Sequence, residues 1–253
     1  MKRGRGCRKL GAVKISIVVP AFNEERLIGE SLAQIKSAAG AFAKIGWETE
    51  LIVCDNNSKD RTTEIARAAG AIVVFEPINQ IARARNSGAA AATGDWLFFV
   101  DADSHPSAEL FADAADAIRS GKCLAGGATV QMDETKFTLR FVIALWNRTS
   151  RLKKWMSGAF IFVEAVAFRQ IGGFSRELFA TEELDLSNRL KQLARTTGKK
   201  IVILHRHSIK TSARKLKLYT LREILNQFAR AIFRPRRTLS SREATFYWYD
   251  GRR

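Results

Sequence analysis

The chain has 253 residues, of which 46% are hydrophobic and 26% charged, and its formal net charge is +17. This balance excludes an intrinsically disordered chain, and the length is enough for one large α/β domain with a substantial core. The three cysteines lie far apart and form no C-x-x-C pair, which argues against a disulfide framework or a zinc site and suits a reducing compartment.

In the first half of the chain, short apolar runs alternate with helical patterns. We expect strands at 15–19, 51–54, 71–75 and 96–100, and helices at 27–42, 62–69, 81–92 and 108–118. The strand segments are continuous apolar runs, which is typical of a parallel sheet covered by helices on both faces. The pattern therefore predicts an α/β fold with an open, doubly wound, mostly parallel sheet.

After residue 121 the alternation becomes irregular. We expect strands at 124–130, 160–163 and 201–204, and helices at 137–152, 184–194 and 219–233. The sequence shows no internal repeat and no long linker. We therefore predict one domain over 15–205, with a basic tail at 1–14 and a basic extension at 206–253 that contains an amphipathic helix.

The positive charge is concentrated at the two ends. Residues 1–14 contain six Lys or Arg and no acid, and residues 206–253 contain thirteen Lys or Arg and three acids. Such ends fit an anionic partner, such as phosphate-bearing lipid, a membrane surface or nucleic acid, and they equally fit a solvated tail. The basic, aromatic segments 146–155 and 219–237 fit contact with an anionic membrane, or a core-facing stripe with solvated Arg and Lys.

The sequence contains no apolar run of the ~20 residues that a spanning helix needs. An apolar signal-peptide core is also missing after the basic N-terminus. We therefore expect a cytoplasmic protein without a transmembrane helix, whose only membrane contact is peripheral, on the inner face.

Polar residues collect after three of the expected strands. These segments are Pro20-Ala21-Phe22-Asn23-Glu24, Asp55-Asn56-Asn57-Ser58 and Asp101-Ala102-Asp103. Ligands of open α/β sheets bind at the carboxyl ends of the strands, so we expect the three segments to converge.

The pair Asp101 and Asp103 is a candidate metal site. In an extended chain both carboxylates point the same way, and a divalent cation, Mg²⁺ or Mn²⁺, relieves their repulsion. An isolated D-x-D also fits a solvated turn. The position after an apolar strand, with other carboxylates nearby, favours the metal.

The complete set of motifs resembles the family 2 glycosyltransferases of the GT-A fold. The matching segments are 18–24, 55–60, Ala84-Arg85-Asn86, Gly94-Asp95, Asp101-Ala102-Asp103, Gly158-Ala159, Gly172-Gly173-Phe174 and Glu182-Glu183-Leu184-Asp185-Leu186, with Arg189 following. The resemblance implies a donor half at about 15–120 and an acceptor half at about 121–205. It further implies inverting, metal-dependent transfer of a sugar from a UDP- or GDP-sugar to a hydroxyl acceptor, in the synthesis of cell envelope polysaccharide or glycolipid, where the acceptor can be lipid-linked.

The resemblance also implies roles for single residues. The residues expected to bind the nucleotide-sugar are Pro20, Ala21, Glu24, Asp55, Asn57, Arg85 and Asp101. Asp101 and Asp103 are expected to hold the metal and the diphosphate. Glu183 is the expected general base, although the family usually has Asp there and the extra methylene moves the carboxylate. Glu182 is the alternative base, and both residues also fit a role as helix caps only.

A late histidine completes the metal shell in related enzymes, which makes His205 a candidate ligand. His207 would lie on the same side of an extended strand. Both histidines also fit a basic surface segment, and the unknown distance to Asp101 and Asp103 favours that interpretation.

Two other function classes fit part of the pattern. A nucleic-acid-binding protein fits the net charge, but the nearly neutral middle of the chain and the acidic strand ends count against it. A nucleotidyltransferase would also use paired carboxylates and Mg²⁺. It is expected to have a Gly-rich basic loop after the first strand, and residues 20–24 are acidic and lack glycine.

Overall fold

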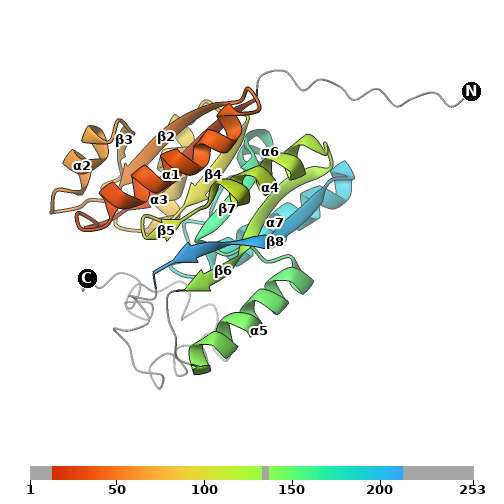
Figure 1. The fold of residues 1–253 in the computed structure, drawn as a ribbon. Coiled ribbons are helices and arrows are strands. Elements are labelled where there is room, and N and C mark those ends of the chain that lie inside the picture. Colours follow the sequence, from red (N-terminus) through yellow and green to blue (C-terminus); the bar gives the residue numbers. More distant parts are fainter. Residues whose placement is uncertain (1–12, 133–136, 213–253) are drawn as a thin grey trace, which may run out of the picture.

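The structure is a computed structural model that describes residues 13–132 and 137–212 (Figure 1). Most of both basic ends, including the helix expected at 219–233, lies outside the described residues. None of the helices that the structure describes combines the length and the apolar character needed to span a membrane.

The first half of the chain folds as expected from its alternating pattern. Its elements are β1 (Lys14–Ala21), α1 (Ile28–Ala43), β2 (Glu48–Asp55), α2 (Thr62–Ala68), β3 (Ile72–Phe75), α3 (Ile81–Ala91) and β4 (Trp96–Val100). β1 pairs in parallel with β2 and β4, and β2 pairs in parallel with β3. The carboxyl ends of these strands therefore lie at one edge of the sheet.

The second half adds strands of both directions. Its elements are β5 (Ser104–His105), α4 (Ala108–Arg119), β6 (Cys123–Met132), α5 (Phe137–Lys153), β7 (Phe160–Glu164), α6 (Ala165–Gln170), α7 (Glu182–Thr197) and β8 (Lys200–Thr211). β7 is antiparallel to β4 and β6, β6 is parallel to β8, and β5 is antiparallel to β8. The described strands form one sheet in the order β3-β2-β1-β4-β7-β6-β8-β5.

The expected α/β sheet is thus confirmed, and its second half is mixed rather than parallel. β8 continues seven residues beyond the strand expected at 201–204, because its far end pairs with both β6 and β5. The boundary expected at 205 therefore falls inside a strand of the sheet.

Both faces of the sheet are covered, which explains why its strands are continuous apolar runs. On one face, Phe98 of β4 meets Phe42 of α1 at 5.3 Å and Phe111 of α4 at 5.7 Å between ring centroids. On the other face, the neighbouring Phe99 meets Phe168 of α6 at 5.2 Å and Phe174 at 5.0 Å. Successive residues of a strand point to opposite faces, so each strand of this kind supplies two cores.

The resemblance motif Gly94-Asp95 has a structural role at the start of β4. A Cβ atom on Gly94 would lie 2.6 Å from Ser16 Oγ and 2.7 Å from the Ser16 backbone nitrogen of β1. Asp95 accepts a hydrogen bond from the Lys14 backbone N–H at 2.9 Å. The pair therefore fixes the turn into β4 at the edge of the sheet opposite the three polar segments.

Candidate functional site

The ends of β1 and β2 bring two of the three polar segments together. Ala21 pairs with Asp55 across the two strands, and the Asn56 backbone N–H donates to the Ala21 oxygen at 2.8 Å. Pro20 pairs with Cys54 one step earlier. Asp55 is buried, and its Oδ1 accepts from the Ser58 backbone N–H at 3.1 Å, which turns the chain after the strand.

The loops after β1 and β2 hold each other in place. The Asn23 backbone N–H donates to Ser58 Oγ at 2.9 Å, and the Lys59 backbone N–H donates to Asn23 Oδ1 at 2.8 Å. Asn23 and Asn57 both have left-handed backbones, with φ of 51° and 68°, a conformation that asparagine tolerates better than most residues. Asn57 also donates from Nδ2 to the Pro77 oxygen at 3.0 Å.

Glu24 lies where the first of these loops enters α1. Its side chain is buried, and its backbone N–H donates to Thr62 Oγ1 at 2.7 Å. Its backbone oxygen accepts from Ile28 at 2.8 Å. The expected nucleotide-side residues Pro20, Ala21, Glu24, Asp55 and Asn57 are thus gathered at one edge of the sheet.

Asp101 and Asp103 follow β4 at the same edge, but the chain there is a turn. The Ser104 backbone N–H donates to the Asp101 oxygen at 3.0 Å, which closes the turn. The extended backbone that the sequence suggested for these residues is therefore replaced by a turn, and strand alternation does not set the directions of the two carboxylates. Asp101 keeps 23% of its side chain exposed, and Asp103 is buried, with its backbone oxygen accepting from Ser212 at 3.2 Å.

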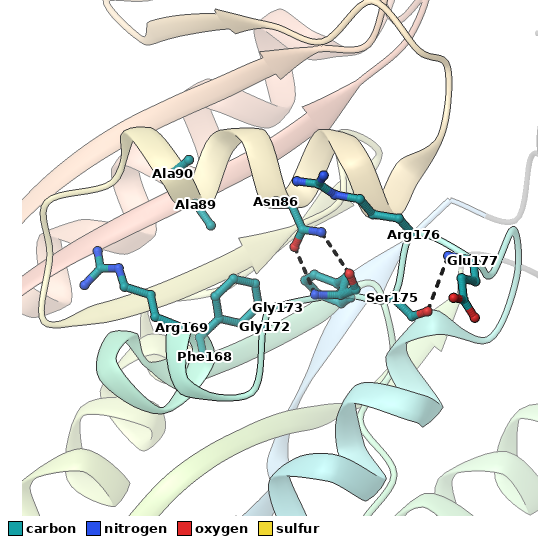
Figure 2. A pocket seen from close by; sticks show the side chains of 11 residues that line it. Asn86, Ala89, Ala90, Phe168, Arg169, Gly172, Gly173, Ser175, Arg176 and Glu177 are labelled. Atoms are coloured by element: carbon teal, nitrogen blue, oxygen red, sulfur yellow. Dashed lines mark hydrogen bonds between the residues drawn. The ribbon is translucent and has the colours of Figure 1, made fainter.

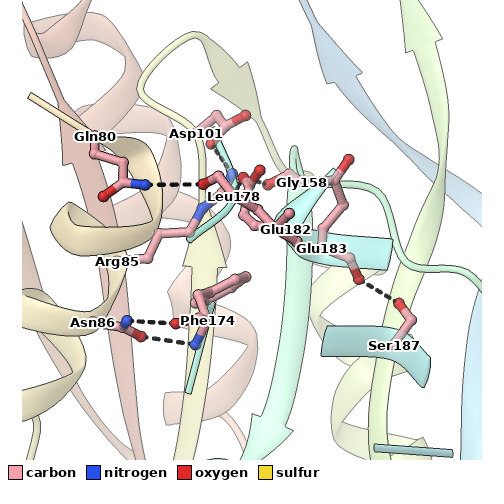
Figure 3. Close-up of polar contacts among 10 residues, drawn as sticks. All are labelled: Gln80, Arg85, Asn86, Asp101, Gly158, Phe174, Leu178, Glu182, Glu183 and Ser187. Atoms are coloured by element: carbon pink, nitrogen blue, oxygen red, sulfur yellow. Dashed lines mark hydrogen bonds and ion pairs between the residues drawn. The ribbon is translucent and has the colours of Figure 1, made fainter. Parts of the chain in front are cut away.

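Arg85 of α3 is the centre of the charged cluster that Figure 3 shows. Its fully buried guanidinium pairs with Asp101 Oδ1 at 2.9 Å and with Glu182 Oε1 at 2.6 Å. It also donates to the Gly158 oxygen at 3.1 Å and lies over the Phe174 ring. Burial alone would lower the pKa of Arg85, but the carboxylates of Asp101, Glu182 and Glu183 outweigh it and raise the pKa above its ordinary value.

Gly158 is needed for the close approach of Arg85. A Cβ atom at this position would lie 2.9 Å from Arg85 Nη2. A side chain here would push the guanidinium away from the Gly158 oxygen and from Asp101. The family resemblance includes this glycine, and its contact with Arg85 explains why a glycine is needed here.

Glu182 and Glu183 begin α7 and have different environments. Glu182 is buried and committed to Arg85, whereas Glu183 is only partly buried. Burial, followed by the repulsion from the Glu182 carboxylate, raises the pKa of Glu183 to about 8. Figure 3 shows the Glu183 carboxyl group extending from the helix toward the side on which Asp101 lies. Both carboxyl groups lie at the positive end of the helix dipole, so the capping role also remains compatible with the structure.

Two amide side chains of α3 and its N-cap hold the loop that leads to α7. Asn86 donates to the Phe174 oxygen and accepts from the Phe174 N–H, both at 2.9 Å. Gln80 donates to the Arg176 and Leu178 oxygens at 2.9 and 3.0 Å. A Cβ on Gly173, which has φ of +71°, would lie 2.6 Å from Asn86 Oδ1. Sequence reasoning missed Gln80, because no local pattern marks a glutamine whose partners are almost a hundred residues away.

The structure does not bring His205 to the aspartates. His205 and His207 lie inside β8, where His205 is exposed and His207 Nδ1 lies 3.0 Å from Asp113 Oδ2 of α4. Leu204, next to His205, pairs with Ala128 of β6, and Thr211 pairs with Met132, four residues further along β6. At about 3.3 Å per residue, these two points of the sheet are about 13 Å apart. It is the far end of β8, at Ser212, that contacts Asp103. No group of three or more His, Cys, Asp or Glu that could hold a metal occurs within residues 13–132 and 137–212.

An open cavity of about 490 Å³ lies along α3, and Phe174, whose ring lies under Arg85, is one of its lining residues (Figure 2). Its lining includes the buried Ala89 and Phe168 and the exposed Ala90, Arg169 and Arg176. None of the expected donor, metal or base residues lines it. The candidate site is therefore formed by the carboxyl ends of β1, β2 and β4 together with the Arg85 cluster, and not by this cavity.

Comparisons with known proteins place these features in a family. The family model described as Glycosyl transferase family 2 matches residues 16–173. Glucosyl-3-phosphoglycerate synthase from Mycolicibacterium smegmatis is 38% identical over 97 residues, which cover 35% of this chain and 30% of that protein. The chain spans about a third of the length of the curated relatives that it matches.

Solved structures share the fold. TarS from S. aureus matches with a TM-score of 0.64 at 22% identity, over 80% of this chain and 61% of that one. The mannosyltransferase PcManGT from Pyrobaculum calidifontis, solved with GDP-Man and Mn²⁺, matches with a TM-score of 0.60 at 19% identity, over 79% of this chain and 56% of that one. The arrangement of sheet and helices described above is therefore the one that these proteins have.

Proposed function

The chain belongs to glycosyl transferase family 2 and has the GT-A fold, and from this premise we propose that it transfers a sugar from a nucleoside-diphosphate sugar to a hydroxyl acceptor. One observation carries the proposal. The buried Arg85 links Asp101, at the end of β4, to Glu182, at the start of α7. In support, this link ties the start of α7, where Glu183 lies, to the carboxyl end of β4, and ligands of such sheets bind at the carboxyl ends of the strands.

The donor binds along the ends of β1, β2 and β4 in this proposal. Asp55 holds the base, Pro20, Ala21, Glu24 and Asn57 line the nucleotide side, and Asp101 lies toward the ribose and diphosphate. The donor is a UDP- or GDP-sugar. In support, TarS has been solved with UDP-GlcNAc and PcManGT with GDP-Man.

A divalent metal, Mg²⁺ or Mn²⁺, fits this edge only as an ion shared with the donor. Asp101 already uses one oxygen on Arg85, and the described residues form no group of three metal-binding side chains. Asp103 and Asp101 would supply carboxylate oxygens, and the diphosphate would complete the shell, as is usual for Mg²⁺. When bound, the metal neutralises the charge that grows on the departing nucleoside diphosphate. His205 is not among the proposed metal ligands, because it lies in β8 away from the end of that strand that contacts Asp103.

Glu183 is the proposed general base. As the acceptor oxygen attacks the anomeric carbon from the face opposite the leaving group, Glu183 takes the hydroxyl proton, and the nucleoside diphosphate departs with the electrons of the broken bond. The configuration at that carbon is inverted. Glu182 is less suited to this role, because its ion pair with Arg85 at 2.6 Å occupies its carboxylate and fixes its position. The proposed acceptor is a lipid-linked hydroxyl compound of the cell envelope.

Binding of nucleoside diphosphates tests the donor side directly. We would measure the melting temperature with UDP, GDP or ADP, each with Mn²⁺, Mg²⁺ or EDTA. A ligand at a hundred times its Kd stabilises the native state by about 2.7 kcal/mol, which corresponds to roughly 5–10 °C for a domain of this size. We expect UDP or GDP to give this shift only with metal, and Asp55→Ala to lose it while Asp113→Ala on α4 keeps it. Equal shifts in EDTA would contradict the shared metal, and no shift with either nucleotide would contradict the donor site.

A further inference from the structure

Helix α5 has two faces, and only one of them packs on the protein. On the inner face, Asn147 donates to the Val130 oxygen and accepts from the Val130 N–H of β6, both at 2.9 Å, and Trp146 packs against the core. On the outer face, Phe141, Leu145 and Leu152 are 64%, 56% and 72% exposed. Their spacing of four and then seven residues puts them on one line along the helix. The helix is therefore already docked, and its apolar stripe faces outward.

The outer face is also strongly basic. α5 contains Arg140, Arg148, Arg151 and Lys153 and no acidic residue, and Lys154 follows it. Arg148 continues the line of Phe141 and Leu145. Long Arg and Lys side chains can cover apolar surface while their charged heads reach outward. An exposed apolar stripe bordered by basic residues is typical of a helix that lies in the interface of an anionic membrane.

The charges favour lipid over the other occupants of such a face. A second copy of the chain would bring a helix without acids against another helix without acids. The chain's own residues 213–253 contain eleven Lys or Arg and three acids, so their net charge is positive and does not complement the basic face of α5. A surface of anionic lipid complements both the apolar stripe and the charge.

We propose that the outer face of α5 docks the protein on an anionic phospholipid surface. The end of α5 is tied to α7, the helix that begins with Glu182 and Glu183. Trp155 Nε1 donates to Asn188 Oδ1 at 3.2 Å, and the Met156 N–H donates to Ser187 Oγ at 3.0 Å. In Figure 1, α5 lies outside the sheet, next to β6, on the side of the acceptor half. Docking through α5 therefore turns the acceptor half toward the lipid.

Vesicle binding by the full chain tests the proposal. The wild type is sedimented with vesicles of phosphatidylcholine alone and with vesicles that also contain phosphatidylglycerol. The test variant is Phe141→Ser/Leu145→Ser/Leu152→Ser. The matched control is Ile72→Ser/Phe75→Ser/Ile78→Ser, which removes three apolar side chains in and after β3 that are 49–59% exposed. We expect binding to the anionic vesicles only, weakened about ten-fold or more in the α5 variant and less than about two-fold in the control.

Several results would overturn the proposal. These are no binding by the wild type, equal binding to neutral vesicles, or full binding by the α5 variant, which would assign binding to the basic ends alone. A wild-type dimer that the α5 variant converts to a monomer would show that a second copy covers the face. A melting temperature lowered in the α5 variant but not in the control would show that the chain itself covers it. Asp103→Asn should bind vesicles like the wild type, so failure of the proposed activity and failure of docking are distinguishable.

Discussion

In the first half of the chain, β1, β2 and β4 run parallel, and each delivers its polar segment to one edge of the sheet immediately after the strand ends. In the second half, β7 is antiparallel to both of its neighbours, and the residues that reach the same edge come from the Gly158 turn and the start of α7. The proposed donor side is therefore built by local sequence. The proposed acceptor side is built by contacts across long sequence distances, above all by the pair of Arg85 and Glu182, which are 97 residues apart.

The largest expected effect separates the chemistry from donor binding. Glu183→Gln keeps the size of the side chain but cannot take the acceptor proton, so we expect the rate of transfer to fall by about 10²–10⁴-fold. The melting shift caused by the nucleotide should be unchanged, because the donor residues lie at the other strand ends. The exposed Glu177→Gln is the control. If Glu183→Gln retained its rate, the base would have to be sought elsewhere, with Glu182 first.

The next effect breaks the link between the two halves. Arg85→Met leaves the Asp101 and Glu182 carboxylates without their buried cation, and we expect the free energy of unfolding to fall by about 3–5 kcal/mol. Denaturant unfolding measures this change. Arg61→Met removes only an exposed ion pair with Glu64 and should cost less than about 1 kcal/mol. Equal losses in the two variants would mean that Arg85 does not hold the halves together.

The pH dependence of the rate tests the environment of Glu183. With its pKa raised to about 8, the base is mostly protonated at neutral pH, so the rate should rise about ten-fold per pH unit below 8 and then level off. A rate that is flat from about pH 6 to pH 9 would contradict the raised pKa.

The same shift predicts the sign of a stability change. The folded pKa lies above the ordinary value of 4.5, so the native state binds the extra proton. Its stabilising contribution is complete below about pH 4.5 and is lost as the pH rises to about 8, with a slope of at most about 1.4 kcal/mol per pH unit. Glu183→Gln should remove that slope, as followed by denaturant unfolding across this range.

The smallest effect concerns the loop between the halves. Asn86→Ala leaves the Phe174 backbone N–H and oxygen without their side-chain partner, at a cost of about 1–3 kcal/mol in unfolding free energy. The rate should also fall, because this loop leads to Glu182. Gln34→Ala, on the exposed side of α1, should change neither quantity. A normal rate in Asn86→Ala would show that the loop does not position α7.

The sequence predicted the parts whose signal is local. Four apolar runs predicted β1 to β4, and the polar segments after three of them mark the carboxyl ends of the strands, where the candidate site lies. Two short elements, β5 and α6, carry too few residues for a periodic pattern. The direction of β7 and the length of β8 depend on their partners, which no single segment encodes.

The site shows the same division. The extended backbone expected at Asp101–Asp103 was wrong, because the chain turns immediately after β4. His205 was a candidate ligand through family resemblance only, because sequence spacing does not show how far β8 runs. Only the family resemblance pointed to Gly158 and Asn86. The structure explains why these residue types are needed: Gly158 lies against Arg85, and Asn86 bonds the backbone of Phe174. Glu183 stays a prediction, which the structure supports by separating its environment from that of Glu182.

The most direct measurement is turnover of the donor by the full chain with Mn²⁺, followed as release of nucleoside diphosphate from a panel of UDP- and GDP-sugars. We predict metal-dependent release from at least one donor in the wild type. Asp103→Asn, whose charge is lost at the proposed metal, should lose about 100-fold or more of this rate without a matching loss of fold. Equal release by wild type and Asp103→Asn, or no release from any donor by a folded preparation, would contradict a metal-dependent donor site at the end of β4.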